Sequence, residues 1–174
     1  MSDSGAAFPL QASLFYWHGR LQQHMDVTVD RQLAEFGVTY RQWSLMSVLF
    51  CGQADTVRGV AAILRLDPGA VTRLATRLCE KALMKRTPDE RDARSVRLIL
   101  TTAGREMVPV LNGMVAATEK SFTDSLSQSE QSDFRCMLSR MMAAGGDGAM
   151  TDYLDCQHCP SSDAGQPTIG CSRQ

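Results

Sequence analysis

The sharpest boundary in this 174-residue sequence is a helix start at Asp67, Pro68 and Gly69. Asp67 supplies a capping carboxylate, and Pro68 already has the backbone angle that the first helical turn requires. The helix is predicted to continue to about Ala82. One face is apolar, with Val71, Leu74, Leu78 and Cys79, and the opposite face carries Thr72, Arg73, Thr76 and Arg77.

A second short helix is predicted just before this one, from a cap at Thr56 to Leu64, with Val57, Val60 and Ala61 pointing inward. Two short helices joined by a brief turn, the second with a basic exposed face, are typical of a helix-turn-helix. Two extended runs follow, at residues 83–87 and 95–100, around a charged loop. They predict a β-hairpin, and a hairpin directly behind a helix-turn-helix is a wing.

The charge distribution supports a polyanionic partner for this segment. Residues 56–105 carry 11 Lys and Arg against 5 Asp and Glu, whereas the whole chain has a net charge of −1. The phosphate backbone of nucleic acid attracts such a basic segment, and acidic flanks limit nonspecific binding. This pattern favours DNA binding over a purely protein-binding module.

Helical periodicity predicts further helices on both sides of the basic segment. One covers residues 10–36 and ends at Gly37, and a second runs from Tyr40 to about Cys51. Thr101 caps a fifth helix, in which Pro109 and Gly113 predict a bend. Ser127 and Glu130 form a capping box for a sixth helix that ends near residue 143. Residues 144–174 are predicted to be a flexible tail that contains cysteines.

The run from Asp67 to Val108 resembles the recognition helix, wing and following helix of the MarR family of winged helix-turn-helix transcriptional regulators. The matching segments are Val71 to Leu74, Leu78 to Leu83, Arg86, Asp92 to Arg94, and Leu100 to Gly104. In this order and spacing they indicate a MarR-like domain over residues 10–143. The expected fold is mainly α with a small β-hairpin wing, in which residues 56–101 form the winged helix-turn-helix.

The resemblance implies a homodimer held by N- and C-terminal dimerisation helices, at residues 10–36 and 102–143, on a palindromic double-stranded operator. It also implies a repressor. Two-fold symmetry pairs two winged modules with such a site. The resemblance places Arg94 in the minor groove, with Asp92 beside it. The full set of predicted DNA-binding residues is Gly69, Thr72, Arg73, Thr76, Arg77, Arg86, Arg91, Asp92 and Arg94.

Family members commonly release DNA when a small aromatic or phenolic acid binds between the dimer helices and the DNA-binding lobe. Aromatic and cationic candidates for such a site are Trp17, His18, Arg20, Trp43 and Met46. The alternative is structural: a histidine on an apolar stripe needs a partner in the fold, and the tryptophans are candidate core residues.

The tail offers a different kind of sensor. Cys156, His158, Cys159 and Cys171 are soft donors that could bind a metal or undergo thiol oxidation. This predicts an alternative redox- or metal-responsive regulator, while a tail without a role is the simpler interpretation. A thiol oxidoreductase normally places such a motif at a helix start in a βαβ unit, which is not predicted here.

Several other classes are not favoured. No catalytic arrangement of histidines and no phosphate-binding glycine loop is present, so we expect neither an enzyme nor a cofactor. The sequence has no apolar run long enough to span a membrane and no secretion signal at its start. A cytoplasmic protein without a membrane partner is therefore expected.

Overall fold

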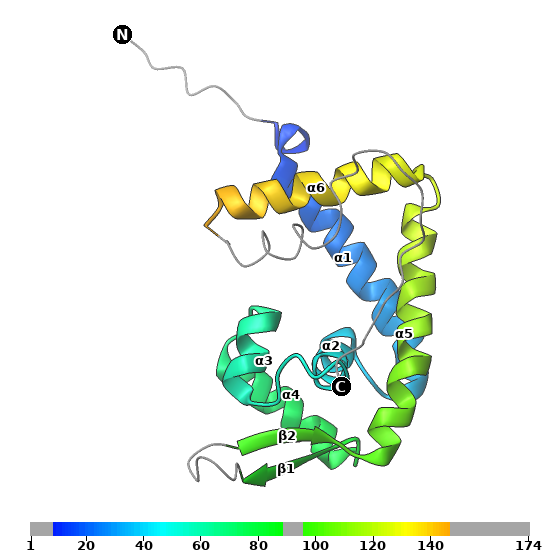
Figure 1. The fold of residues 1–174 in the computed structure, drawn as a ribbon. Helices are drawn as coiled ribbons and strands as arrows, with labels where there is room; N and C mark the ends of the chain where they lie inside the picture. The colour runs from blue at the N-terminus through cyan, green and yellow to red at the C-terminus, as the bar shows by residue number, and fades with distance from the viewer. Residues whose placement is uncertain (1–8, 89–95, 147–174) are drawn as a thin grey trace. The chain divides into compact units, whose positions relative to one another are not determined.

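The structure is a computed structural model in which residues 9–88 and 96–146 are described (Figure 1). It is mainly helical with one two-stranded sheet, as predicted. The elements are α1 (Leu14–Leu33), α2 (Tyr40–Phe50), α3 (Val57–Leu64), α4 (Pro68–Glu80), β1 (Met84–Pro88), β2 (Val96–Leu100), α5 (Thr102–Thr123) and α6 (Gln128–Ala144). The chain divides after Glu119 into two compact units, which are described separately.

The prediction of a single helix over residues 10–36 is wrong at both ends. A short 3₁₀ turn at Leu10–Ala12 is separated from α1 by Ser13, whose backbone is extended at φ −81° and ψ 126°. A second 3₁₀ turn, Ala34–Phe36, follows α1. The stop at Gly37 is confirmed: this residue has a φ of +64°, a left-handed conformation that glycine adopts without steric cost.

The predicted caps of the helix-turn-helix are confirmed. The Thr56 hydroxyl accepts a hydrogen bond from the Gly59 backbone N–H at 3.1 Å, which satisfies a free donor at the start of α3. Asp67 caps α4 in the same way. This helix ends at Glu80 rather than Ala82, because Ala82 has a left-handed φ of +55° in the turn that leads to the hairpin.

The wing is an antiparallel pair in which Met84 lies opposite Leu100 and Pro88 opposite Val96. It is joined to the segment before α3 by two contacts. The Leu98 N–H donates to the Asp55 carbonyl at 2.7 Å, and the Arg97 guanidinium forms a 2.8 Å ion pair with the Asp55 carboxylate. The hairpin is therefore fixed at its base to the helix-turn-helix.

Helix α4 lies between α3 and the hairpin (Figure 1) and packs against α2, α3 and β1. Val71 and Leu78 are fully buried as predicted, while Leu74 and Cys79 are only partly buried. Ala75 is also fully buried, which was not predicted. The largest fully buried apolar side chains are Leu33, Leu45, Met46, Leu78, Leu98 and Leu111. This core holds the opposite face of α4 toward solvent.

Helix α5 starts at the predicted cap, where the Thr101 hydroxyl accepts from the Gly104 N–H at 3.1 Å. The helix continues through Pro109 and Gly113, and the bend expected there stays a prediction. Leu111 and Thr118 of this helix are fully buried.

In the second unit, the capping box at the start of α6 is confirmed. The Glu130 carboxylate accepts from the Ser127 backbone N–H at 2.7 Å, and the Glu130 N–H donates to the Ser127 hydroxyl at 3.3 Å. The apolar stripe of α6 is largely exposed in the single chain, with Phe134, Met137 and Met141 between 43% and 58% exposed.

This capping box predicts a pH effect. Hydrogen bonds from the Ser127 backbone N–H and hydroxyl hold the pKa of Glu130 below its ordinary value of 4.5. A carboxyl with a lowered pKa in the folded state stabilises that state above the unfolded-state pKa, and this contribution is lost as pH falls through the folded-state pKa. We expect the difference in melting temperature between wild type and E130A to shrink as the pH falls below 4.5. Circular dichroism melts measure it.

Glutamine at position 130 is the control, because its amide accepts a hydrogen bond but does not titrate. The melting temperature of E130Q relative to E130A should stay nearly constant over the same pH range. If the difference in melting temperature between wild type and E130A is equally constant, the role given to the carboxylate is contradicted.

Candidate nucleic-acid interface

The start of α4 is organised around the Asp67 carboxylate. One of its oxygens accepts from the backbone N–H groups of Gly69 at 2.8 Å and Ala70 at 3.2 Å. A side chain at Gly69 would crowd this cap, since a Cβ there would lie 2.8 Å from the Asp67 oxygen and 3.4 Å from Nη1 of Arg73. Glycine thus leaves space for both the cap and the Arg73 guanidinium, and a part for Gly69 in DNA binding stays a prediction.

The Asp67 cap is expected to stabilise the folded protein by a measurable amount. We expect D67A to lower the free energy of unfolding by about 1 kcal/mol, because two backbone donors lose their acceptor. Urea unfolding followed by circular dichroism measures this loss. D67N keeps an acceptor oxygen and should lose less than half as much, whereas equal losses in the two variants would contradict a capping role.

The exposed face of α4 carries the predicted Thr72, Arg73 and Arg77, and Thr76 is half-buried. Both threonine hydroxyls donate back into the helix, Thr72 to the Pro68 carbonyl and Thr76 to the Thr72 carbonyl, each at 2.9 Å. Their protons are therefore engaged within α4. The two arginines remain the groups that extend from this face with the donors needed to reach base edges or phosphates.

Arg86 has a positioning role that the sequence did not indicate. Its Nη2 donates to the Thr72 carbonyl at 3.0 Å and to the Thr76 hydroxyl at 2.8 Å. Since Arg86 lies on β1, these hydrogen bonds join the wing to the recognition helix. Direct contact between Arg86 and DNA stays a prediction.

Lys81 secures the other end of α4. Its ammonium donates to the Gly37 carbonyl and, at 3.0 Å, to the side-chain oxygen of Gln42, which is buried. Gln42 also closes the capping box of α2 with Thr39. The last turn of α4 is thus connected to the turn between α1 and α2. Sequence reasoning missed this contact because the partners lie 44 and 39 residues away.

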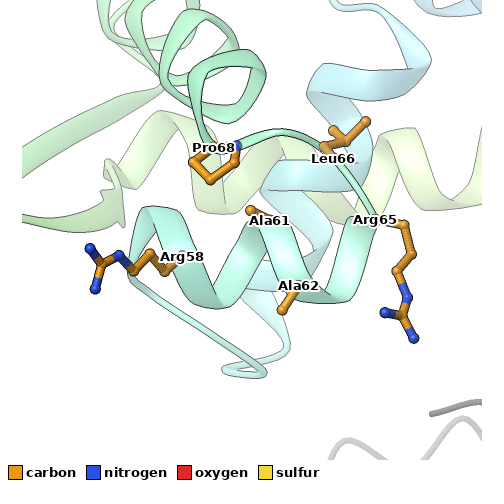
Figure 2. Close-up of a pocket in the computed structure, with 6 residues that line it drawn as sticks. All are labelled: Arg58, Ala61, Ala62, Arg65, Leu66 and Pro68. Atoms are coloured by element: carbon orange, nitrogen blue, oxygen red, sulfur yellow. The ribbon is translucent and has the colours of Figure 1, made fainter. Parts of the chain in front are cut away.

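Two shallow hollows lie beside the start of α4. The first, named the α3 hollow, has a volume of about 540 Å³ and is lined by Arg58, Ala61, Ala62, Arg65, Leu66 and Pro68. Figure 2 shows Arg58 and Arg65 extending from opposite ends of α3. The second, named the α2 hollow, measures about 280 Å³ and is lined by Arg41, Leu66, Ala70, Arg73, Leu74 and Arg77.

Three of these arginines were not predicted as binding residues. Arg58 and Arg65 belong to the basic segment, so its charge excess was a usable signal for them. Arg41 lies in an acidic part of the sequence, and only the fold brings it beside α4.

The predicted aromatic-acid site is not assembled within one chain. Trp17, His18 and Arg20 are exposed on the first half of α1, where the Trp17 indole donates to the Gln11 carbonyl at 2.8 Å. Met46 is fully buried in the core. None of these side chains lines either hollow.

Trp43 belongs to α2 and lies near the end of α1, away from Trp17, His18 and Arg20. Its indole donates to Asn112 of α5 at 2.8 Å. Near it, the backbone N–H of Tyr40 donates to Asp30 at 2.6 Å. Asp30 is ten or more residues beyond Trp17, His18 and Arg20 along α1, a distance of roughly 15 Å or more at 1.5 Å per residue.

Some predicted residues cannot be placed. Arg91, Asp92 and Arg94 of the wing tip, and Cys156, His158, Cys159 and Cys171 of the tail, lie outside the described residues. Cys79 and Cys136 are free thiols. Across residues 9–88 and 96–146, no group of three His, Cys, Asp or Glu side chains could hold a metal ion. In the same ranges, none of the helices combines the length and apolarity required to cross a bilayer.

A capped basic helix, the helix before it, and a hairpin attached to both define the winged helix-turn-helix class. The MarR family profile matches residues 38–96, which span α2 to the first residue of β2. A curated relative, the multiple antibiotic resistance protein MarR of Escherichia coli, is 26% identical over 129 residues, which cover 71% of this chain and 90% of that protein. The chain is thus similar to the MarR family, with the profile match confined to residues 38–96.

Solved structures share this fold. The MepR–DNA complex of S. aureus has a TM-score of 0.72 at 23% identity, covering 76% of this chain and 98% of MepR. CouR of Rhodococcus jostii RHA1, bound to p-coumaroyl-CoA, has a TM-score of 0.67 at 26% identity, covering 78% of this chain and 95% of CouR. The first similarity concerns the fold, while the second extends to sequence.

Proposed function

We propose that this protein is a sequence-specific, DNA-binding transcriptional regulator of the cytoplasm that acts as a repressor on a palindromic operator. The observation that carries this proposal is the solvent-facing arginine pair of α4, Arg73 and Arg77, on a helix fixed by Asp67 at its start and Lys81 at its end. A curated relative that is 29% identical over 115 residues, MgrA of Staphylococcus aureus, is an HTH-type transcriptional regulator, which supports a non-enzymatic role.

A homodimer is part of the proposal. Helix α1 exposes Leu14 (59%), Phe15 (89%), Trp17 (57%) and Leu21 (41%) in the single chain, and α6 separately exposes Phe134, Met137 and Met141. Apolar faces of this kind mark surfaces that a second subunit covers. Two-fold pairing would then present two α4 helices to two operator half-sites.

We further propose that a small aromatic or phenolic acid releases the protein from DNA. The binding of p-coumaroyl-CoA by CouR supports a phenolic effector. In this chain the cationic and aromatic groups of α1 lie together, with the Arg20 guanidinium 5.7 Å from the centre of the Tyr16 ring. Isothermal titration calorimetry with a panel of aromatic acids tests the idea, which fails if none binds while DNA binding is intact.

The DNA-binding function is tested by selecting bound fragments from sheared genomic DNA and confirming them in gel shifts. Enrichment of a palindromic sequence, with binding weakened by salt, is the expected result. Equal recovery of all fragments would contradict sequence specificity, and no recovery would contradict DNA binding altogether. Genes beside the enriched site would indicate the chemical class of the effector.

A further inference from the structure

The two hollows beside α4 form one arginine-rich surface with the recognition helix in its middle. Leu66 lines both hollows, so they adjoin at the turn between α3 and α4. Pro68, the first residue of α4, lines the α3 hollow, whereas Ala70 lines the α2 hollow. The start of the recognition helix is therefore flanked by Arg58 on one side and Arg41 on the other.

Four arginines of this surface are available to a ligand. Within residues 9–88 and 96–146, no hydrogen bond or ion pair engages the guanidinium groups of Arg41, Arg58, Arg73 or Arg77. Neither hollow has an acidic lining residue. Asp67 lies between Leu66 and Pro68 in sequence, and its carboxylate accepts hydrogen bonds from the Gly69 and Ala70 N–H groups. A surface with several such cations favours an extended polyanion.

The dimensions of B-form DNA identify which part of it would meet each arginine. An α-helix with its side chains is about 10–12 Å wide, and the major groove is about 12 Å wide. A helix in the groove consequently has a phosphate backbone on either side. Side chains on α4 reach the base edges, while side chains on the elements that flank α4 reach the two backbones.

We propose that Arg58, in the α3 hollow, and Arg41, in the α2 hollow, bind phosphates of the two DNA strands on opposite sides of the docked α4 helix. This inference rests on the proposed DNA-binding function and adds two anchoring residues to it. Such contacts hold the protein in register without reading sequence, so they contribute equally to operator and nonspecific DNA.

The test measures fluorescence anisotropy of two labelled 30-base-pair duplexes, one of random sequence and one carrying the selected operator, between 50 and 200 mM salt. For each of R41A and R58A we expect affinity for both duplexes to fall by a common factor, on the order of 10-fold. The slope of log K against log salt should become shallower by about 1.8, or 0.9 for each of two protomers. R41K and R58K keep the charge and should retain the wild-type slope.

R31A is the matched control, because Arg31 is an exposed arginine on α1 that lines neither hollow. It should leave both affinities and both slopes unchanged. Wild-type slopes in R41A and R58A would overturn the proposal, as would a loss confined to the operator, which would indicate base reading. Failure of the wild-type protein to bind either duplex would instead reject the DNA-binding function on which the inference rests.

Discussion

Replacing Arg73 with alanine is expected to remove most of the preference of this protein for its operator. Arg73 is exposed on α4 and lies beside the helix start, where its Nη1 would be 3.4 Å from a Cβ at Gly69. A bidentate arginine–guanine pair contributes about 1–3 kcal/mol of discrimination. In a dimer both copies are lost, so we expect operator affinity to fall by about 30-fold or more, with a much smaller change on random DNA.

The measurement is a competition gel shift of operator against random duplex, with folding checked by circular dichroism. R73K separates geometry from charge, because lysine lacks the planar fork that matches two guanine acceptors. It should recover nonspecific binding but not the operator preference. Equal losses of R73A on both duplexes would show that Arg73 contacts phosphate rather than bases.

Replacing Gly104 with alanine is expected to destabilise the fold more than any other alanine substitution at a described glycine. A Cβ at this position would lie 2.1 Å from the Leu83 carbonyl oxygen, and backbone cannot move aside as a flexible side chain does. That carbonyl also accepts from the Thr101 N–H at 3.1 Å. The change would therefore separate the start of α5 from the base of the wing, at a cost of about 3 kcal/mol or more.

Gly113 provides the matched control within the same helix. A Cβ there meets nothing within 4 Å, so G113A should be neutral or stabilising by up to about 1 kcal/mol, as expected for alanine in an exposed helix interior. Urea unfolding of both variants gives the comparison. Similar stabilities for G104A and G113A would show that the α5–wing contact is not as close as described.

These two predictions depend on different amounts of structural information. The exposure of Arg73 was predictable, because the apolar spacing of Val71 and Leu78 sets which face of the helix is buried. Gly104 appeared in the sequence only as part of a family-like motif. Its close approach to Leu83 requires the hairpin to return the chain to the end of α4, which no local pattern specifies.

The sequence by itself determined the order of helices and hairpin and the starts of α3, α4 and α6. Those features depend on residues within three positions of each other, as in the caps at Thr56, Asp67 and Ser127. The break at Ser13 was missed because helical apolar spacing continues across it while its backbone is extended.

Only the tertiary structure decided how the proposed DNA-binding surface is held and how wide it is. Lys81 reaches Gly37, Arg86 reaches Thr72 and Thr76, and Arg41 joins the arginines of α4 around the α2 hollow. The physical reason is distance along the chain. Each of these contacts joins residues 10 to 44 positions apart, and it forms only when packing of the core has brought their elements together.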